Sequence, residues 1–322
     1  MIVERFALGK DSRVVEIACN DGYLLQYFIA KGMPTLGIEP AANVAAVARN
    51  KGVPTIVKFF GEEVAQELVA EGRQADLLIG NNVLAHVPDL NGFVRGMKTL
   101  LAPHGLITME FPHLMRLMME NQFDTIYHEH FSYFSLTTVE KVFAAHGLTL
   151  FDVEELPTHG GSLRIFARHT ADLSKPVGQR VTGLRSREET AGFTGLQHYL
   201  SFADQVRETK RQLLDFLIGI KREGKSIAGY GAPAKANTLL NYCGIRSDFM
   251  DYTVDRSPHK QGLFLPGTHI PILPPETIRA TKPDYLLILP WNLKAEIRQQ
   301  LSYVREWGGQ FIIPIPRVQV SS

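Results

Sequence analysis

Short apolar runs alternate with amphipathic stretches through the first third of the chain. The apolar runs predict β-strands at residues 13–18, 35–40, 54–60, 75–82 and 105–112. The stretches between them repeat apolar residues at three- and four-residue spacing. They predict helices at residues 22–32, 41–52, 62–72 and 90–105. Strand–helix alternation of this kind predicts an α/β fold with a mostly parallel sheet covered on both faces.

The pattern changes after residue 127. Residues 135–147 predict a helix, and two apolar stretches that follow predict an antiparallel pair of strands. The polar residues 171–192 predict a linker or loop. A long helix is expected at residues 196–224 and leads into a second, smaller α/β unit. Its expected strands lie at the start of residues 225–244 and at 251–255, 284–290 and 310–316.

Three regions follow from this pattern. We expect a ligand-binding domain at 1–125, an active-site segment with antiparallel strands and a linker at 126–195, and a C-terminal domain at 196–322. The chain has 322 residues, which is enough for two domains of the usual length of about 100–200 residues each.

Composition and charge exclude several classes of protein. Lysine and arginine number 34 against 33 aspartates and glutamates, which argues against a nucleic-acid binder that works by neutralising phosphates. No apolar run approaches the ~20 residues of a membrane span, so no membrane partner is expected. The two cysteines, Cys19 and Cys243, are too few for a disulfide framework or a four-cysteine zinc site. A reducing, cytoplasmic location is the expectation.

A polar loop of small residues, "VVEIACNDGYLL", joins the first predicted strand to its helix. Such a turn lets a ligand approach backbone N–H groups at a helix N-terminus. It is not G-x-G-x-x-G, because Ala18 stands where the first glycine would and only Gly22 remains. Glu16 and Asp21 suit a cationic, amine-bearing ligand better than a pyrophosphate. S-adenosylmethionine has a sulfonium, an ammonium and no phosphate.

The ends of the next strands carry further candidate ligands for this cofactor. Glu39 follows the second strand, about twenty residues on, where a carboxylate can accept hydrogen bonds from ribose hydroxyls. "GNNVLAHVPDL" follows the strand at 75–82. The residues expected to bind the methyl donor S-adenosylmethionine are Glu16, Ala18, Asn20, Gly22, Glu39, Asn81 and Asn82.

The segment "FDTIYHEHFSYFS" places four titratable side chains, residues 127–130, in a row. An extended segment would put Tyr127 and Glu129 on one side and His128 and His130 on the other. In a helical turn, the four side chains would instead point in different directions around the helix axis. A catalytic cluster, a metal site and simple packing are the alternatives. The metal reading is disfavoured because no H-E-x-x-H is present.

Two glycine-containing stretches predict contacts to the substrate that accepts the methyl group, referred to below as the acceptor. "GYGAPAKANTLLNY" can cradle a phosphate at a helix start, with Lys235 and Asn237 as ligands, although a turn without a ligand fits the bare motif too. "PTHGGSLR" allows close backbone approach and offers donors to phosphate or sugar oxygens. Its candidates are His159, Gly160, Ser162 and Arg164. The other histidines, His113 among them, are expected at the surface or at caps.

Taken together, these stretches resemble one family. "VVEIACNDGYLL", "NNVLAHVPD", "FDTIYHEHFSYFS", "PTHGGSLR", "GYGAPAKANTLLN" and "LPWN" are similar to segments of S-adenosylmethionine-dependent C-methyltransferases that act on nucleotide-linked deoxysugars. That group includes the TDP-4-keto sugar 3-C-methyltransferases. The resemblance implies a class I methyltransferase domain with a Rossmann-like parallel sheet, then a smaller Rossmann-like α/β domain that binds the sugar nucleotide. S-adenosylmethionine is the implied cofactor and a nucleotide sugar the implied substrate.

The same resemblance assigns catalytic roles. Tyr127, Glu129 and His130 match the family's catalytic cluster, and His86 matches a further active-site histidine. We expect His130 or Tyr127 to take the C3 proton and Glu129 to orient its neighbour. His86 would hydrogen-bond the keto or enolate oxygen, and His128 would pack behind them.

One departure and three alternatives accompany these expectations. Family members usually begin with a small zinc domain holding four cysteines, which this chain lacks at its front, so any acceptor contacts of that domain are in doubt. The alternatives are O- or N-methylation of a related acceptor, a nicotinamide-dependent oxidoreductase, and a non-catalytic sugar-nucleotide binding module. The oxidoreductase is disfavoured because neither glycine loop completes G-x-G-x-x-G.

Overall fold

The computed structural model describes residues 2–321, which form two compact units. The N-terminal unit comprises the residues up to Met115 together with Glu129–Thr194. The C-terminal unit comprises Arg116–His128 together with the residues from Gly195 on. The expected three-part division is therefore drawn differently in the structure. Most of the segment expected at 126–195 belongs to the N-terminal unit, and residues 116–128 belong to the C-terminal unit.

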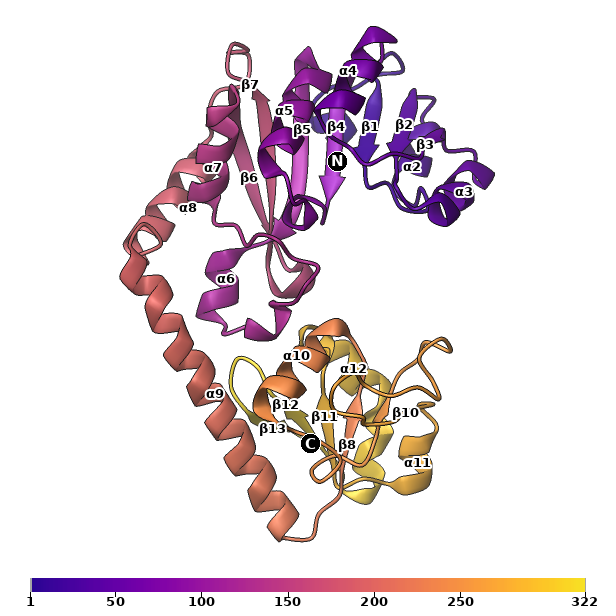
Figure 1. The fold of residues 1–322 in the computed structure, drawn as a ribbon, viewed down its shortest axis with the longest axis vertical. Helices are drawn as coiled ribbons and strands as arrows, with labels where there is room; N and C mark the ends of the chain where they lie inside the picture. Colours follow the sequence, from indigo (N-terminus) through magenta and orange to yellow (C-terminus); the bar gives the residue numbers. More distant parts are fainter. Residues whose placement is uncertain (1, 322) are drawn as a thin grey trace. The chain divides into compact units, whose positions relative to one another are not determined.

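A seven-stranded sheet forms the centre of the N-terminal unit, in the order β3-β2-β1-β4-β5-β7-β6 (Figure 1). Strands β1 to β5 pair in parallel, and β7 pairs antiparallel with both β5 and β6. The strands are β1 (Val14–Ile17), β2 (Thr35–Ile38), β3 (Thr55–Ile56), β4 (Ala75–Asn81), β5 (Leu101–Pro112), β6 (Leu148–Leu156) and β7 (Ser162–His169). Strand order reverses between β1 and β4, so the carboxyl ends of these two strands border the expected ligand crevice.

The helices expected in this unit are present with shorter ends, and α1 and α8 are present in addition. They are α1 (Ile2–Arg5), α2 (Leu25–Ile29), α3 (Ala42–Asn50), α4 (Glu62–Ala70), α5 (Leu90–Leu100), α7 (Leu136–Ala145) and α8 (Gln179–Thr190), with 3-10 turns η1 (Leu84–His86) and η3 (Thr158–Gly160). Side chains cap two of them: Asp89 accepts the N–H of Gly92 before α5, and Ser135 accepts that of Thr138 before α7. α6 (Leu114–Met119) spans the boundary between the units.

The expectation of a linker or loop at 171–192 is wrong over α8. This helix is polar along most of its length because it buries only a narrow stripe. Val181, Leu184 and Glu188, at three- and four-residue spacing, are its buried positions. Two apolar residues in twelve give too weak a period to be recognised in the sequence.

The C-terminal unit contains a six-stranded sheet in the order β10-β9-β8-β11-β12-β13. Numbered within the unit, this is the 3-2-1-4-5-6 order of doubly wound nucleotide-binding folds. Only β13 is antiparallel. The strands are β8 (Ile227–Tyr230), β9 (Thr253–Val254), β10 (Ile272–Leu273), β11 (Tyr285–Ile288), β12 (Gln310–Ile313) and β13 (Gln319–Ser321).

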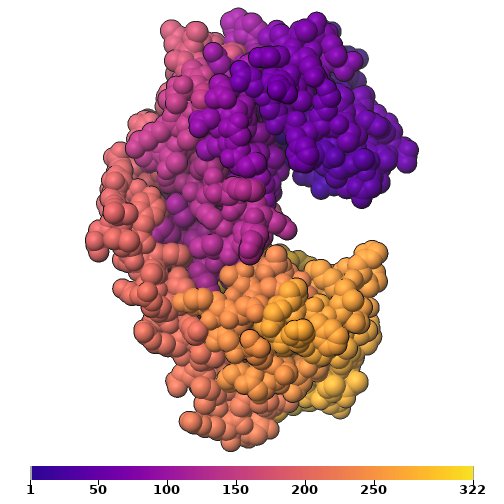
Figure 2. All heavy atoms as spheres, in the orientation of Figure 1, coloured from indigo at the N-terminus to yellow at the C-terminus, as the bar shows by residue number. Residues whose placement is uncertain are grey.

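The helices around this sheet pack on a single apolar core. They are α9 (Leu196–Arg222), α10 (Ala234–Cys243), α11 (Thr277–Thr281) and α12 (Lys294–Gln300), with 3-10 turns η2 (Phe123–Thr125), η4 (Trp291–Leu293) and η5 (Ser302–Trp307). Within this unit, orange to yellow in Figure 2, side chains fill the spaces that the ribbon leaves open. Across residues 2–321, no helix combines the length and apolar character that a membrane crossing requires.

Candidate active site

The loop after β1 lies at the crevice between β1 and β4 and is held in a left-handed backbone conformation. Ala18, Asn20 and Gly22 have φ values of 55°, 54° and 77°. Only Gly22 has a steric need for glycine, because a Cβ there would lie 2.7 Å from Cγ2 of Val53. Ala18 and Asn20 adopt a conformation that costs non-glycine residues about 1–3 kcal/mol when the surroundings enforce it.

Glu39 holds this loop from the end of β2. Its Oε2 accepts the N–H of Asn20 at 3.1 Å, and its Oε1 accepts the N–H of Ala41 at 2.9 Å. Each carboxylate oxygen keeps a lone pair for a ribose hydroxyl, so this contact is compatible with the expected role of Glu39.

Glu16 lies on β1 beneath the same loop and is 1% exposed. Its Oε2 has no hydrogen-bond partner among residues 2–321. Burial raises the pKa of Glu16 to about 8. A buried carboxyl without a partner is costly and fits a cationic ligand group, such as the ammonium of S-adenosylmethionine. Asp21, the other acid of the loop, is instead paired with Lys51 at the surface.

An apolar cavity of about 400 Å³ borders the loop on the side of β2 and η1. Flat apolar and aromatic walls of this kind suit an adenine ring. Its lining includes Ala18, Ile38, Phe60, Val83, His86 and Phe93. Asn81 ends β4, and Asn82 follows it with a φ of 53°. The seven residues expected to bind the donor therefore all lie at the carboxyl ends of β1, β2 and β4.

Residues 127–130 form neither a strand nor a helix but an irregular turn. The boundary between the units falls inside it, with Tyr127 and His128 in the C-terminal unit and Glu129 and His130 in the N-terminal unit. His86 on η1 contacts the second pair. Its Nδ1 lies 2.7 Å from the backbone carbonyl oxygen of Glu129, and its ring centroid lies 4.8 Å from that of His130.

This hydrogen bond fixes the protonation pattern of His86. A carbonyl oxygen can only accept, so Nδ1 carries the hydrogen and, in the neutral ring, Nε2 carries the lone pair. Burial lowers the pKa of His86, and the nearby His130 lowers it further. His86 is therefore suited to accept a proton at Nε2. The sequence led us to expect a hydrogen-bond donor at this position.

The "PTHGGSLR" loop is ordered mainly by contacts within the N-terminal unit. His159 has a φ of 56°, and its Nε2 lies 3.3 Å from Nδ2 of Asn82. Gly160 follows with a φ of 93°. Ser162 is buried, and its hydroxyl donates to the Thr158 carbonyl.

Glu110 is a residue of this loop's environment that sequence reasoning missed. It lies near the end of β5, is 6% exposed, and accepts from Thr158 Oγ1 at 2.9 Å and from Arg164 Nη2 at 2.8 Å. Arg164 also lines a cavity of about 230 Å³ together with Asn81 and Arg5. Glu110 thus ties the "PTHGGSLR" loop to β5, the strand next to β4.

A second missed pair lies where the catalytic segment ends. Glu188 is fully buried and accepts from His113 Nε2 at 2.8 Å, from the N–H groups of Leu136 and Thr137, and from Thr137 Oγ1. Burial raises its pKa, but these hydrogen bonds outweigh burial and the pKa lies below its ordinary value. The carboxylate therefore caps α7. His113 does not lie at the surface, since it is 2% exposed, and it contacts the carboxylate that caps α7.

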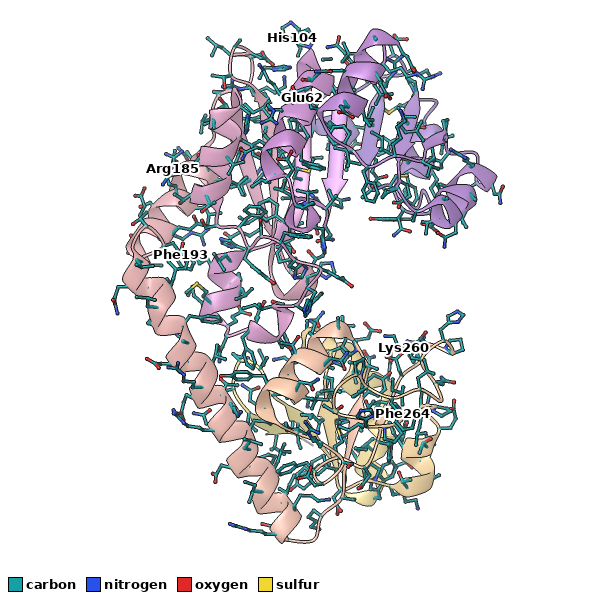
Figure 3. The ribbon with its side chains drawn as sticks, in the orientation of Figure 1. Glu62, His104, Arg185, Phe193, Lys260 and Phe264 are labelled. Atoms are coloured by element: carbon teal, nitrogen blue, oxygen red, sulfur yellow. The ribbon has the colours of Figure 1, made fainter. Side chains whose placement is uncertain are left out.

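The crevice of the C-terminal unit repeats the design of the first. The loop after β8 turns at Gly231, with a φ of 89°, where a Cβ would lie 2.6 Å from Cδ of Pro290. Asp255, directly after β9, accepts the N–H groups of Ala232 and Ser257, both at 2.8 Å. Lys260, labelled in Figure 3, donates to the Ala232 carbonyl at 2.9 Å.

The two candidate ligands of this crevice lie on α10. Lys235 Nζ donates to Asn292 Oδ1 at 2.8 Å and lies 4.4 Å from the ring centroid of Trp291. Asn237, two residues on, has a buried Oδ1 without a partner in the described part of the chain. The structure thus places Lys235 and Asn237 at the start of the same helix.

Comparison with known proteins identifies the family. A family model described as the C-methyltransferase C-terminal domain matches residues 157–316, and one described as a methyltransferase domain matches residues 2–153. The chain is 39% identical over 322 residues to the C-methyltransferase NovU of Streptomyces niveus, covering 100% of this chain and 76% of that protein. The chain belongs to the S-adenosylmethionine-dependent C-methyltransferase family.

Two further similarities cover a smaller part of the chain. A ubiquinone biosynthesis O-methyltransferase of Azorhizobium caulinodans is 26% identical over 99 residues, 30% of this chain and 39% of that protein. A crystal structure of magnesium protoporphyrin IX methyltransferase from Synechocystis, with bound S-adenosylhomocysteine, covers 52% of this chain and 78% of its own, with 13% identity and a TM-score of 0.43.

The C-methyltransferase uses S-adenosylmethionine, and its first crevice fits that group. Glu16 offers a buried carboxyl whose Oε2 has no partner within residues 2–321, and Glu39 offers lone pairs at the end of β2. The apolar cavity offers a place for the adenine ring. The expected fold class, a class I methyltransferase sheet followed by a smaller Rossmann-like domain, is confirmed.

Proposed function

We propose that this C-methyltransferase methylates carbon, at C3, of a nucleotide-linked 4-keto deoxysugar, as a step of deoxysugar biosynthesis. The observation that carries the proposal is the second nucleotide-type crevice, in the C-terminal unit, which presents Lys235 and Lys260 where the first crevice presents acids. Lys235 lies in the first turn of α10, and a helix N-terminus with a lysine nearby is typical of phosphate sites. The motifs Y-x-E-H-F, H-G-G-S-x-R and G-Y-G-A-x-A-K support the same acceptor class by resemblance.

The acceptor chemistry requires a base beside the donor. A proton on C3, next to the C4 ketone, is acidic because the enolate spreads its charge onto the C4 oxygen. In this proposal Nε2 of His86 takes that proton and the C–H electron pair becomes the enolate. Bound S-adenosylmethionine supplies the electrophilic methyl group that bonds to C3, and S-adenosylhomocysteine leaves.

The neighbouring residues stabilise charge and hold the acceptor. His130, next to His86, and Tyr127 donate to the enolate oxygen, and Glu129 fixes the His86 tautomer through its backbone carbonyl. The proposed ligands of the sugar and diphosphate are His159, Gly160, Ser162, Arg164, Lys235 and Asn237. The two free cysteines, both buried, fit a reducing cytoplasmic location.

Methyl-labelled donor and a panel of nucleoside-diphosphate 4-keto-6-deoxysugars test this function directly. The reaction is run in D₂O, and the product is analysed by NMR. We expect the label on C3 and deuterium exchange at C3 in the presence of S-adenosylhomocysteine, which permits proton removal without methyl transfer. Label on oxygen or nitrogen would indicate an O- or N-methyltransferase instead, and near-normal turnover of His130→Asn would remove His130 from the mechanism.

A further inference from the structure

A buried carboxyl lies just ahead of the catalytic turn. Asp124 on η2 is 0% exposed, and its Oδ2 accepts the indole N–H of Trp291 at 2.7 Å. Trp291 begins η4, which follows β11 at the crevice of the C-terminal unit. Phe123, beside Asp124, packs in the same core and lies edge-on to Tyr242 of α10, with centroids 5.3 Å apart. The start of the catalytic segment is therefore docked on α10 and η4.

The same indole ring contacts the candidate phosphate ligand. Lys235 Nζ lies 4.4 Å from the centroid of Trp291 and donates to Asn292, the next residue along the chain. Burial lowers the pKa of Lys235, while the charge of Asp124 raises it. Trp291 thus contacts Asp124 through its N–H and Lys235 through its π face.

Burying a carboxyl at position 124 costs free energy of folding. Its Oδ1 has no hydrogen-bond partner among residues 2–321. Burial raises the pKa of the carboxyl to about 7, against the lowering effects of Trp291 and Lys235. Apolar side chains in place of both Asp124 and its indole partner would fill the site without burying polar groups. A directional bond to a single partner offers what an apolar contact does not, a defined position for η2.

We propose that Asp124 is a positioning residue whose hydrogen bond to Trp291 fixes the segment leading into Tyr127, and that Trp291 links this segment to an anion bound at Lys235. Tyr127 follows Asp124 by three residues, and Glu129 and His130 by five and six. Binding of the acceptor's diphosphate at Lys235 then stabilises the start of the catalytic turn. The inference rests on the proposed function only in taking a diphosphate as the bound group.

Hydrogen exchange tests the positioning role without any acceptor sugar. The chain has two tryptophans, and Trp307 offers a matched control because its indole N–H also donates to an oxygen, the backbone carbonyl of Pro283 at 3.0 Å. We expect Trp291→Phe to raise the exchange rate of residues 122–128 by about tenfold, as for the loss of one buried hydrogen bond. Trp307→Phe leaves that rate unchanged. Equal rates in the two variants would overturn the positioning role.

A second variant covers the case in which Trp291→Phe does not fold. Asp124→Asn keeps an oxygen acceptor for the indole and the volume of the side chain, so exchange of residues 122–128 stays within about threefold of the wild type. Asp124→Leu removes the acceptor and raises it. Slow exchange in Asp124→Leu would overturn the proposal.

Titration with inorganic diphosphate tests the link to Lys235. In Trp307→Phe, Trp291 is the sole tryptophan and its fluorescence reports on the ring. We expect diphosphate to change this emission and to slow exchange of residues 122–128, and we expect neither effect in Trp307→Phe/Lys235→Met. A full response in the Lys235→Met protein would overturn the link. If the wild-type protein methylated no nucleotide sugar, the proposed function would be contradicted. The exchange and fluorescence measurements would still test the positioning role.

Discussion

In each unit, an acidic residue at the end of the second strand holds the loop that follows the first strand. Glu39 accepts the backbone N–H of Asn20 and of the residue two positions after itself, and Asp255 does the same with Ala232. The surroundings of the two carboxylates differ in charge. The first crevice adds the buried Glu16, whereas the second adds Lys260 and Lys235. One backbone design can therefore serve ligands of opposite charge, and in our account these are the sulfonium donor and the diphosphate acceptor.

The proposed base, His86, in contrast, lines the cavity beside the first crevice. We expect His86→Gln to lower turnover by at least about 10²-fold, because it removes the proposed base. Affinity for S-adenosylhomocysteine, measured by calorimetry, stays within about threefold. His104→Gln is the matched control, since that histidine of the same unit, labelled in Figure 3, has a side chain 86% exposed. Near-normal turnover of His86→Gln would assign the proton transfer elsewhere.

Removing the charge of Glu39 should weaken binding of one ligand, and removing the charge of Asp255 should weaken binding of the other. Glu39→Gln weakens S-adenosylhomocysteine binding by about 10–100-fold, the effect expected for hydrogen bonds to a charged group. Asp255→Asn leaves that affinity unchanged and weakens nucleoside-diphosphate binding instead, because its loop loses its anchor. Isothermal titration of both variants with both ligands measures the four affinities. If both variants weakened the same ligand, the parallel between the crevices would fail.

Removing the positive charge tests the second crevice alone. Lys235→Met should weaken nucleoside-diphosphate binding by about tenfold, because one charge-assisted contact to the diphosphate is lost. Lys282→Met, at the exposed end of α11, provides the lysine control. An unchanged dissociation constant in Lys235→Met would move the diphosphate away from α10.

The pH dependence of donor binding tests the first crevice. With its pKa raised to about 8, Glu16 is mostly protonated at pH 7 and must lose its proton to pair with an ammonium. S-adenosylhomocysteine should therefore bind about fivefold more tightly at pH 8 than at pH 7. Calorimetry in buffers of different ionisation enthalpy should show proton release on binding. Glu16→Gln should abolish both effects, and proton uptake by the wild type would contradict the assignment.

The smallest expected effect concerns the strain in the loop after β1. Ala18 has a φ of 55°, so Ala18→Gly should relieve strain at a small entropic cost and change the free energy of unfolding by less than about 1 kcal/mol. Gly22→Ala is the opposite test, because the new methyl group meets Val53, and it should clearly lower the free energy of unfolding. Denaturant unfolding measures both.

The sequence predicted the long or strongly apolar elements and missed elements that are very short or mostly polar. β1, β4 and α9 were predicted within a few residues because their apolar periods are continuous. β10 has two residues, too few for a period to show. α8 was missed because its polar face dominates its sequence.

In the candidate site, too, local patterns were predictable and contacts between distant residues were not. That the residues expected to bind the donor lie close together was predictable, because strand ends in a parallel sheet meet at one edge. Glu110 and Glu188 were not, because their partners are 48 to 75 residues away along the chain. The tautomer of His86 depends on a backbone carbonyl 43 residues on, which no local pattern encodes.

Hydrogen exchange with each ligand alone tests the assignment of donor and acceptor nucleotide to the two crevices most directly. S-adenosylhomocysteine should slow exchange in residues 18–22 and 39–42 and leave residues 231–237 unaffected. A nucleoside diphosphate should slow exchange in residues 231–237 and 255–260 and leave the first loop unaffected. Protection of the first loop by the nucleoside diphosphate, with none in residues 231–237, would contradict the account.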